Sequence, residues 1–322
     1  MSRTSMDMTR GSLKKQILFF SIPLMLSNLL QVLFNMSDIA VIGQFAGAMS
    51  LGAVGSTTTL ISMYTGFLIG LSGGINVLTA LYIGARNRKS VSETVHSAFL
   101  VSLVVGLILL ILGVSTSRGV LVLLNTKEEL IDKAALYIRI YFLGLPFMVI
   151  YNFGAAILRS YGDTRRPLYY LIISGTLNVI LNLLLVIEFH LGVAGVAIAT
   201  TISNMVSTVM VISCLHRKRD EFRFEFHKMR IEWKDLKRVL MIGIPAGIQG
   251  AIFSVSNVFI QSGINSFGED AIAGSSLALN FEYFTYDIFL YYSPRWYFSC
   301  FRMRNTENIC RRRLVLYWRS LS

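Results

Sequence analysis

Between Lys15 and Arg86 the sequence carries a single formal charge, the carboxylate of Asp38. The uncharged run before it, from Gln16 to Ser37, is long enough for a helix to cross the hydrocarbon core of a bilayer, which takes about 20 residues. A charged side chain is costly in hydrocarbon, and one found there usually marks a functional site. The stretch therefore predicts membrane-spanning helices and makes Asp38 the first candidate for a functional residue.

The alternative for Asp38 is a position at the outer end of the first helix, where Ser37 and Asp38 would meet water or cap a turn. Two observations favour the functional interpretation. The residues that follow Asp38 stay apolar, so the helix can continue past it. In addition, a second copy of this helix later in the chain has no acid at the matching place.

The chain as a whole has the composition of a polytopic membrane protein, because 54% of its residues are hydrophobic, 15% are charged and the mean hydropathy is +0.59. The net charge of +12 comes mostly from short loops between apolar runs, which is typical of topology signals and not of a nucleic-acid surface. The three cysteines form no close pair and the four histidines are scattered, so neither a disulfide framework nor a metal site is expected. The N-terminal segment shows no signal-peptide pattern.

Uncharged runs of membrane-spanning length predict an all-α polytopic bundle. The expected helices lie at 16–44, 52–83, 97–117, 136–158, 167–187, 192–215 and 239–265, and an eighth begins near residue 271. Alternate loops are rich in Lys and Arg, and the segment 216–238 alone has nine basic residues against five acidic ones. By the positive-inside rule, this alternation predicts a cytoplasmic N-terminus.

The chain contains an internal repeat, in which Pro23 of LFFSIPLMLSN matches Pro245 of LMIGIPAGIQG at an offset of 222 residues. The match extends to Lys15 with Lys237, and it indicates that helices 7 and 8 repeat helices 1 and 2. Six helices separate the two starts, so both copies cross the membrane in the same direction. Parallel repeats of this kind are one way in which transporters build two lobes around a central cavity.

The repeat divides the chain into segments. The expected segments are a cytoplasmic N-terminus (1–15), a six-helix first lobe (16–215), a basic cytoplasmic linker (216–238), the start of a second lobe with helices 7 and 8 (239–289) and an aberrant tail (290–322). The tail has seven Arg but no Gly, Ala or Lys, and it interrupts the eighth helix. We interpret it as out-of-frame translation, and the alternative is a genuine basic tail that binds anionic lipid.

Asn178 and Asn182 are four residues apart and share one face of the fifth expected helix, which Ser174 extends. Small and hydroxylated side chains often serve helix packing alone, which is the alternative interpretation. If they face Asp38, the two amides form an oxygen-rich pocket that can hold a proton on Asp38 or coordinate Na⁺. Neutralising this pocket would change the preferred packing of the helices, and a cationic substrate would compete for the same charge. The sequence has no Walker-type glycine loop that would indicate direct use of ATP.

The sharpest local motif is LRSYGDTRRP at 158–167, between the fourth and fifth helices. Gly162 and Asp163 predict a turn, basic residues such as Arg165 hold it at the cytoplasmic face, and Pro167 suits the first turn of a helix. Our interpretation of this loop is structural and topogenic.

Several stretches together resemble the MATE family (multidrug and toxic compound extrusion) over about residues 10–288. They are the first helix with Asp38, TALYIGARN (79–87), LRSYGDTRRP (158–167), the helix with Asn178 and Asn182, and GVAGVAIAT (192–200). The resemblance implies two six-helix bundles around a V-shaped cavity, of which this chain contains the first bundle and helices 7 and 8 of the second. It also implies export of cationic, lipophilic compounds driven by H⁺ or Na⁺, with no cofactor.

Carried over residue by residue, the resemblance implies a first-lobe cation site made by Asp38, Asn178, Asn182 and Thr200. Glu282 resembles the acid often found on helix 8. The chain departs from the family pattern because its second lobe stops within that helix.

The expected partners are therefore cationic drugs or toxins and the lipid bilayer of the plasma (inner) membrane, without nucleic acid, and a full-length chain is expected to be a monomer. A flippase for lipid-linked sugars is one alternative, and basic residues that line the central cavity would favour it. The only basic residue within an expected helix, however, is Arg139. A truncated membrane protein that does not transport is another. An enzyme is not expected, since the sequence shows no nucleophile–base pair or metal cluster.

Overall fold

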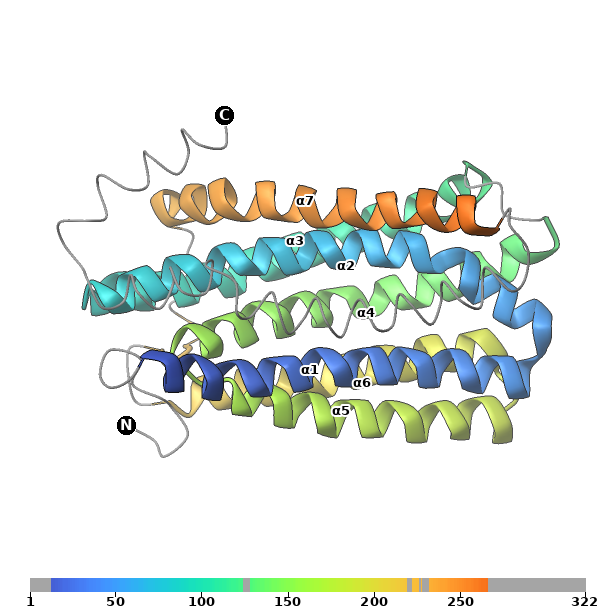
Figure 1. Ribbon diagram of the computed structural model, residues 1–322, viewed down its shortest axis with the longest axis horizontal. Helices are drawn as coiled ribbons and strands as arrows, with labels where there is room; N and C mark the ends of the chain where they lie inside the picture. The colour runs from blue at the N-terminus through green and yellow to red at the C-terminus, as the bar shows by residue number, and fades with distance from the viewer. Residues whose placement is uncertain (1–12, 124–127, 219–221, 226, 228–231, 266–322) are drawn as a thin grey trace.

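The computed structural model describes residues 13–123, 128–218, 222–225, 227 and 232–265 (Figure 1). Every regular element in these ranges is a helix. The elements are α1 (Leu13–Val41), η1 (Ile42–Ala46), α2 (Gly47–Gly84), α3 (Arg88–Leu123), α4 (Glu128–Ser160), α5 (Arg165–Leu183), η2 (Leu184–Glu188), α6 (Gly192–His216) and α7 (Trp233–Asn265), where η marks a short π-helix. The all-α prediction is confirmed.

Seven stretches of these helices are long and apolar enough to cross a membrane, so the chain is a multi-pass membrane protein. In Figure 1 the helices lie roughly side by side along one direction. α4 occupies the middle of the bundle and packs against α2, α3 and α6. α7 lies along α2 on one side, and α1 lies along α5 on the other.

The first two helices are joined without the loop that the sequence predicted at about 45–51. α1 runs through the π-turn η1 directly into α2, and the direction changes at Gly47, whose φ of +81° lies in the left-handed region that glycine tolerates best. α3, α4 and α7 also begin or end several residues beyond the uncharged windows. Charged residues can continue a helix past the hydrocarbon into water, so a count of uncharged residues underestimates helix length.

The linker between α6 and α7 packs back onto the bundle through two phenylalanines, Phe222 and Phe224, which are each 1% exposed. The Phe224 ring lies 4.2 Å from the ring of Phe99 on α3, and Phe222 lies 4.5 Å from Tyr161 at the end of α4. Burying an aromatic side chain of this size stabilises such a contact by about 2 kcal/mol. The linker that the sequence predicted as a basic cytoplasmic segment is thus anchored to the first lobe.

Helix 8, Glu282 and the tail 290–322 lie outside the described residues, so the structure places none of them. Within the described residues, the two copies of the repeat can be compared only in the first helix of each copy. Pro23 lies inside α1 and Pro245 lies inside α7, as the alignment of the two copies requires.

Candidate cation site

Asp38 lies inside the first helix, because α1 continues to Val41 and then into η1. The side chain therefore does not cap a helix end, as the alternative interpretation required. It is half-buried and faces α5, along which α1 packs. The close approach of these two helices depends on Gly175 of α5, because a Cβ there would overlap the ring of Phe34 on α1.

A chain of hydrogen bonds joins Asp38 to α5 and α6. The amide nitrogen Nδ2 of Asn182 donates to Oδ1 of Asp38 and, at 3.2 Å, to Oδ1 of Asn178. Asn178 Nδ2 in turn donates to the hydroxyl of Thr200 at 3.3 Å, and this hydroxyl donates to the carbonyl of Val196 at 3.0 Å. The four residues proposed from the sequence are thus brought together in one network.

One oxygen of this network has no partner within the described part of the chain. Asn182 is fully buried, and its Oδ1 accepts no hydrogen bond there. A buried acceptor without a donor is costly, and native proteins usually satisfy it with water, an ion or a ligand. The carboxylate, amide and hydroxyl oxygens around it are the ligands that hard cations prefer.

Two tyrosines that were not predicted from the sequence lie near the carboxylate of Asp38. Tyr137 and Tyr141 of α4 are both within electrostatic range of Asp38, and their rings stack on each other with centroids 6.2 Å apart. Their spacing of four residues puts them on one helical face, which was the only signal available in the sequence. Ser174, by contrast, bonds the carbonyl of Leu171 at 3.3 Å and does not take part in the network.

The loop between α4 and α5 contains the turn that its sequence predicted. Gly162 has a φ of +83°, and the carboxylate of Asp163 accepts the backbone N–H of Arg166 at 3.2 Å in the first turn of α5. The guanidinium of Arg166 lies 3.3 Å from the other carboxylate oxygen. Burial raises the pKa of Asp163, although its bonds to Arg166 act in the opposite direction. The carbonyl of Pro167 accepts the hydroxyl of Tyr151 at 3.2 Å, which ties the loop to α4.

Arg165 is exposed at the start of α5. Within the described helices and loops, no group of three His, Cys, Asp or Glu residues could hold a metal ion. Among the described residues, the oxygen network around Asp38 is the candidate ion site that the geometry supports.

The family model "MatE" matches residues 23–184, which is half of the chain and includes three of the four network residues. The chain belongs to the MatE family. Its sequence is 32% identical to "Probable multidrug resistance protein YpnP" of Bacillus subtilis over 83% of this chain and 60% of that protein. It is 27% identical to "Probable multidrug resistance protein NorM" of Thermotoga maritima over 84% of this chain and 59% of that protein.

Solved structures of the family have the same fold. This MatE chain superposes with a TM-score of 0.80 on a multidrug resistance MATE family transporter in an outward-facing conformation, at 26% identity over 88% of this chain and 63% of that one. The TM-score is 0.77 for a MATE in the bent conformation, at 27% identity over 85% of this chain and 61% of that one. The two-lobe helical fold is confirmed, and the chain spans about 60% of the length of these relatives.

Proposed function

We propose that the chain is a secondary multidrug efflux transporter of the plasma membrane, with its N-terminus in the cytoplasm. It would export cationic, lipophilic compounds in exchange for H⁺ or Na⁺ that binds at Asp38. The observation that carries the proposal is the network of Asp38, Asn182, Asn178 and Thr200, which joins three helices around one carboxylate. The names of the relatives, which are multidrug resistance proteins, support the transported class.

The network suits a singly charged ion. It contains one carboxylate and otherwise neutral oxygens, so one proton or one Na⁺ cancels its charge, whereas a divalent ion would leave an excess positive charge. The Asn182 amide can serve both states. Its Nδ2 donates to the charged carboxylate, and its free Oδ1 can accept the O–H of a protonated Asp38 after the amide rotates.

The same network can couple ion binding to the packing of helices. Asp38 is on α1, the two asparagines are on α5 and Thr200 is on α6, so a change in the hydrogen bonds of Asp38 acts on all three helices. An ion shifts a conformational equilibrium by its difference in affinity for the two states. A cationic drug attracted to the Asp38 carboxylate would compete with that ion, which is the basis of an exchange.

The proposal predicts that Asp38→Asn abolishes efflux, because the amide keeps the shape of the side chain but removes the charge. Efflux of ethidium, a cationic lipophilic dye, would be followed in cells that express the chain. The matched control is Asp132→Asn, since Asp132 is 84% exposed in a surface ion pair with Arg118. We expect the control to match the wild type and Asp38→Asn to match an empty vector. Equal efflux from Asp38→Asn and wild type, or none from the wild type, would refute the proposal.

A further inference from the structure

The hydroxyl of Tyr82, at the end of α2, is held from two sides by the start of α7. It donates to Oδ1 of Asp235 at 2.5 Å and accepts from Nη1 of Arg238 at 2.6 Å. Asp235 and Arg238 are three residues apart, on one face of α7, so the tyrosine sits between an acid and a base of the same helix. The contact joins residues that are more than 150 positions apart in the sequence.

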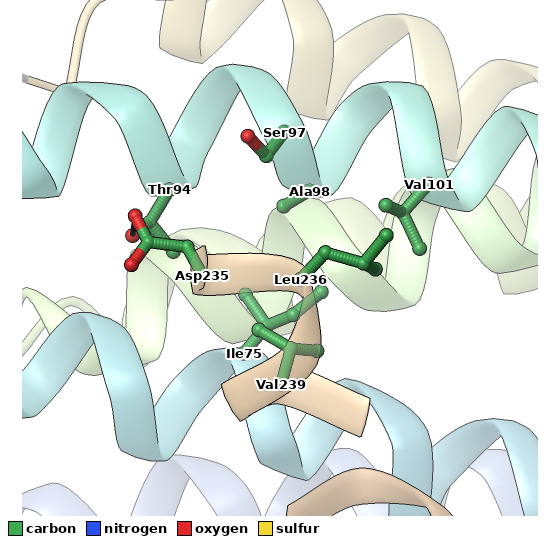
Figure 2. A pocket seen from close by; sticks show the side chains of 8 residues that line it. All are labelled: Ile75, Thr94, Ser97, Ala98, Val101, Asp235, Leu236 and Val239. Atoms are coloured by element: carbon green, nitrogen blue, oxygen red, sulfur yellow. Dashed lines mark hydrogen bonds between the residues drawn. The ribbon is translucent and has the colours of Figure 1, made fainter. Parts of the chain in front are cut away.

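A third helix completes this cluster. The hydroxyl of Thr94, near the start of α3, lies 3.5 Å from Oδ2 of Asp235 (Figure 2). Asp235 is only 5% exposed, and its Oδ1 accepts the hydroxyl of Tyr82, whereas the Thr94 hydroxyl has a nearer acceptor in the carbonyl of Ser90 at 2.8 Å. The ends of α2, α3 and α7 thus meet at one buried carboxylate.

The cluster is a contact between helices and not a second ion site. The cavity beside it measures about 10 Å³ and is lined mainly by apolar side chains such as Ile75 and Val101. This volume is close to the least that one water molecule needs, so a drug or a hydrated ion does not fit.

Beyond this cluster, α2 and α7 touch through glycines. Gly66, Gly70 and Gly74 of α2 lie against Gly250, Gly247 and Gly243 of α7. We call these six residues the glycine seam. A Cβ on Gly70 would overlap the backbone of Gly247, and one on Gly74 would come within 2.6 Å of the carbonyl of Val239. Glycine contacts bring the two backbones together, and the side chains of Phe67 and Leu71 of α2 lie over Gly247 and Gly243 of α7.

The sequence repeat shows that the cluster is specific to this pair of helices. At the offset of 222 residues, Asp235 and Arg238 of α7 match Leu13 and Gln16 at the start of α1. The acid and the base are therefore not a general feature of the helix that starts each lobe.

We propose that Tyr82, Thr94, Asp235 and Arg238 form a latch that holds the start of the second lobe against the first lobe at the cytoplasmic ends of α2, α3 and α7. The glycine seam packs α2 and α7 closely along part of their length, and the latch ties their ends together while it is closed. Its role in a transport cycle rests on the proposed function, in which release of the latch would open the cavity to the cytoplasm. The latch contact itself does not depend on that function, because it concerns only the distance between the helix ends.

The test measures the separation of α3 and α7 in the full chain in lipid nanodiscs. Spin labels would be placed at Arg88→Cys and Lys237→Cys, both exposed positions, in a chain whose three cysteines are changed to serine. Distance distributions from electron double resonance would be compared for the parent chain, Tyr82→Phe, Asp235→Asn and the double variant. Tyr169→Phe, which removes the hydroxyl of an exposed tyrosine on α5, is the matched control.

We expect one short distance in the parent chain and in the control, and an added longer population in Tyr82→Phe and in Asp235→Asn. The double variant should show no more opening than either single variant, because the two side chains act through one contact. Unchanged distributions in both single variants, additive opening in the double variant or a parent chain that is already open would each overturn the latch. No drug or ion gradient is applied, so this result is independent of the efflux result for Asp38→Asn.

Discussion

Asp163 is a buried carboxylate whose contribution to the stability of its loop depends on pH. Its side chain is fully buried, its carboxylate caps the first turn of α5, and the ion pair with Arg166 does not fully offset the loss of water. The consequence is a pKa raised above its ordinary value by burial. A group of this kind binds its proton more tightly in the folded chain than in the unfolded chain.

The sign of the pH effect follows from linkage. Below the unfolded pKa of 3.8 both states are protonated, and as the pH rises towards the raised folded pKa the unfolded chain loses its proton first. The contribution of Asp163 to stability therefore falls through this window and stays at the lower level above it. Asp163→Asn keeps an oxygen that can accept the N–H of Arg166 and does not titrate.

We therefore predict that the stability advantage of the wild type over Asp163→Asn shrinks as the pH rises above about 4. Melting temperatures of both proteins in detergent would be measured at each pH, with Asp132→Asn as a surface control. An advantage that grows with pH would show that the bonds to Arg166 outweigh burial.

The candidate site illustrates what sequence reasoning can and cannot reach at this scale. The spacing of Asn178 and Asn182 was sufficient to put them on one face, and the lone charge of Asp38 was sufficient to select it. The sequence could not show that Asn182 would contact Asp38, because that depends on how α1 packs along α5 at Gly175. It gave no reason to choose Tyr137 and Tyr141, since aromatic pairs at this spacing are common in apolar helices.

At the scale of the helices, α2 provides a matched pair of glycines that separates packing from helix propensity. Gly70 meets the backbone of Gly247, whereas a Cβ on Gly73 would meet no atom of the described residues within 4 Å. Both lie inside the same helix, so alanine improves helix propensity at each by about 1 kcal/mol.

We predict that Gly70→Ala lowers the free energy of unfolding by about 1–3 kcal/mol, because the backbones of α2 and α7 must move apart. Gly73→Ala should be neutral or slightly stabilising. Thermal unfolding in detergent, followed by helical circular dichroism, would compare the two variants. Equal melting temperatures would mean that the glycine seam is not a close contact in the folded chain.

The existence and order of the helices could be predicted well, because long uncharged runs leave few other structures possible in a membrane. Their ends could not, as α3 shows, since it begins at Arg88 and not within the uncharged window that starts at 97. The continuous passage from α1 into α2 was also missed. Nothing in the apolar sequence around Gly47 distinguishes a short loop from a π-helical turn followed by one glycine with a positive φ.

At the scale of the whole molecule, the basic loops predict which side of the membrane each helix end occupies. A cysteine at Asp132, near the start of α4, should react in intact cells with a maleimide that cannot cross the membrane. A cysteine at Lys237, near the start of α7, should react only after the cells are permeabilised, because it lies on the positive side. Both would be placed in a chain without its native cysteines. The reverse pattern of labelling would invert the proposed orientation.

The glycine seam also sets an order of events during synthesis. Gly74 is made roughly 170 residues before its neighbour Gly243. At about 5–20 residues per second, α2 stands in the membrane for about 10–30 seconds before α7 exists. During that time its glycine face lacks the α7 surface that covers it in the finished chain. Mutations in the seam should therefore harm assembly of the nascent chain as well as the finished protein, and they should make newly made chains more vulnerable to membrane proteases.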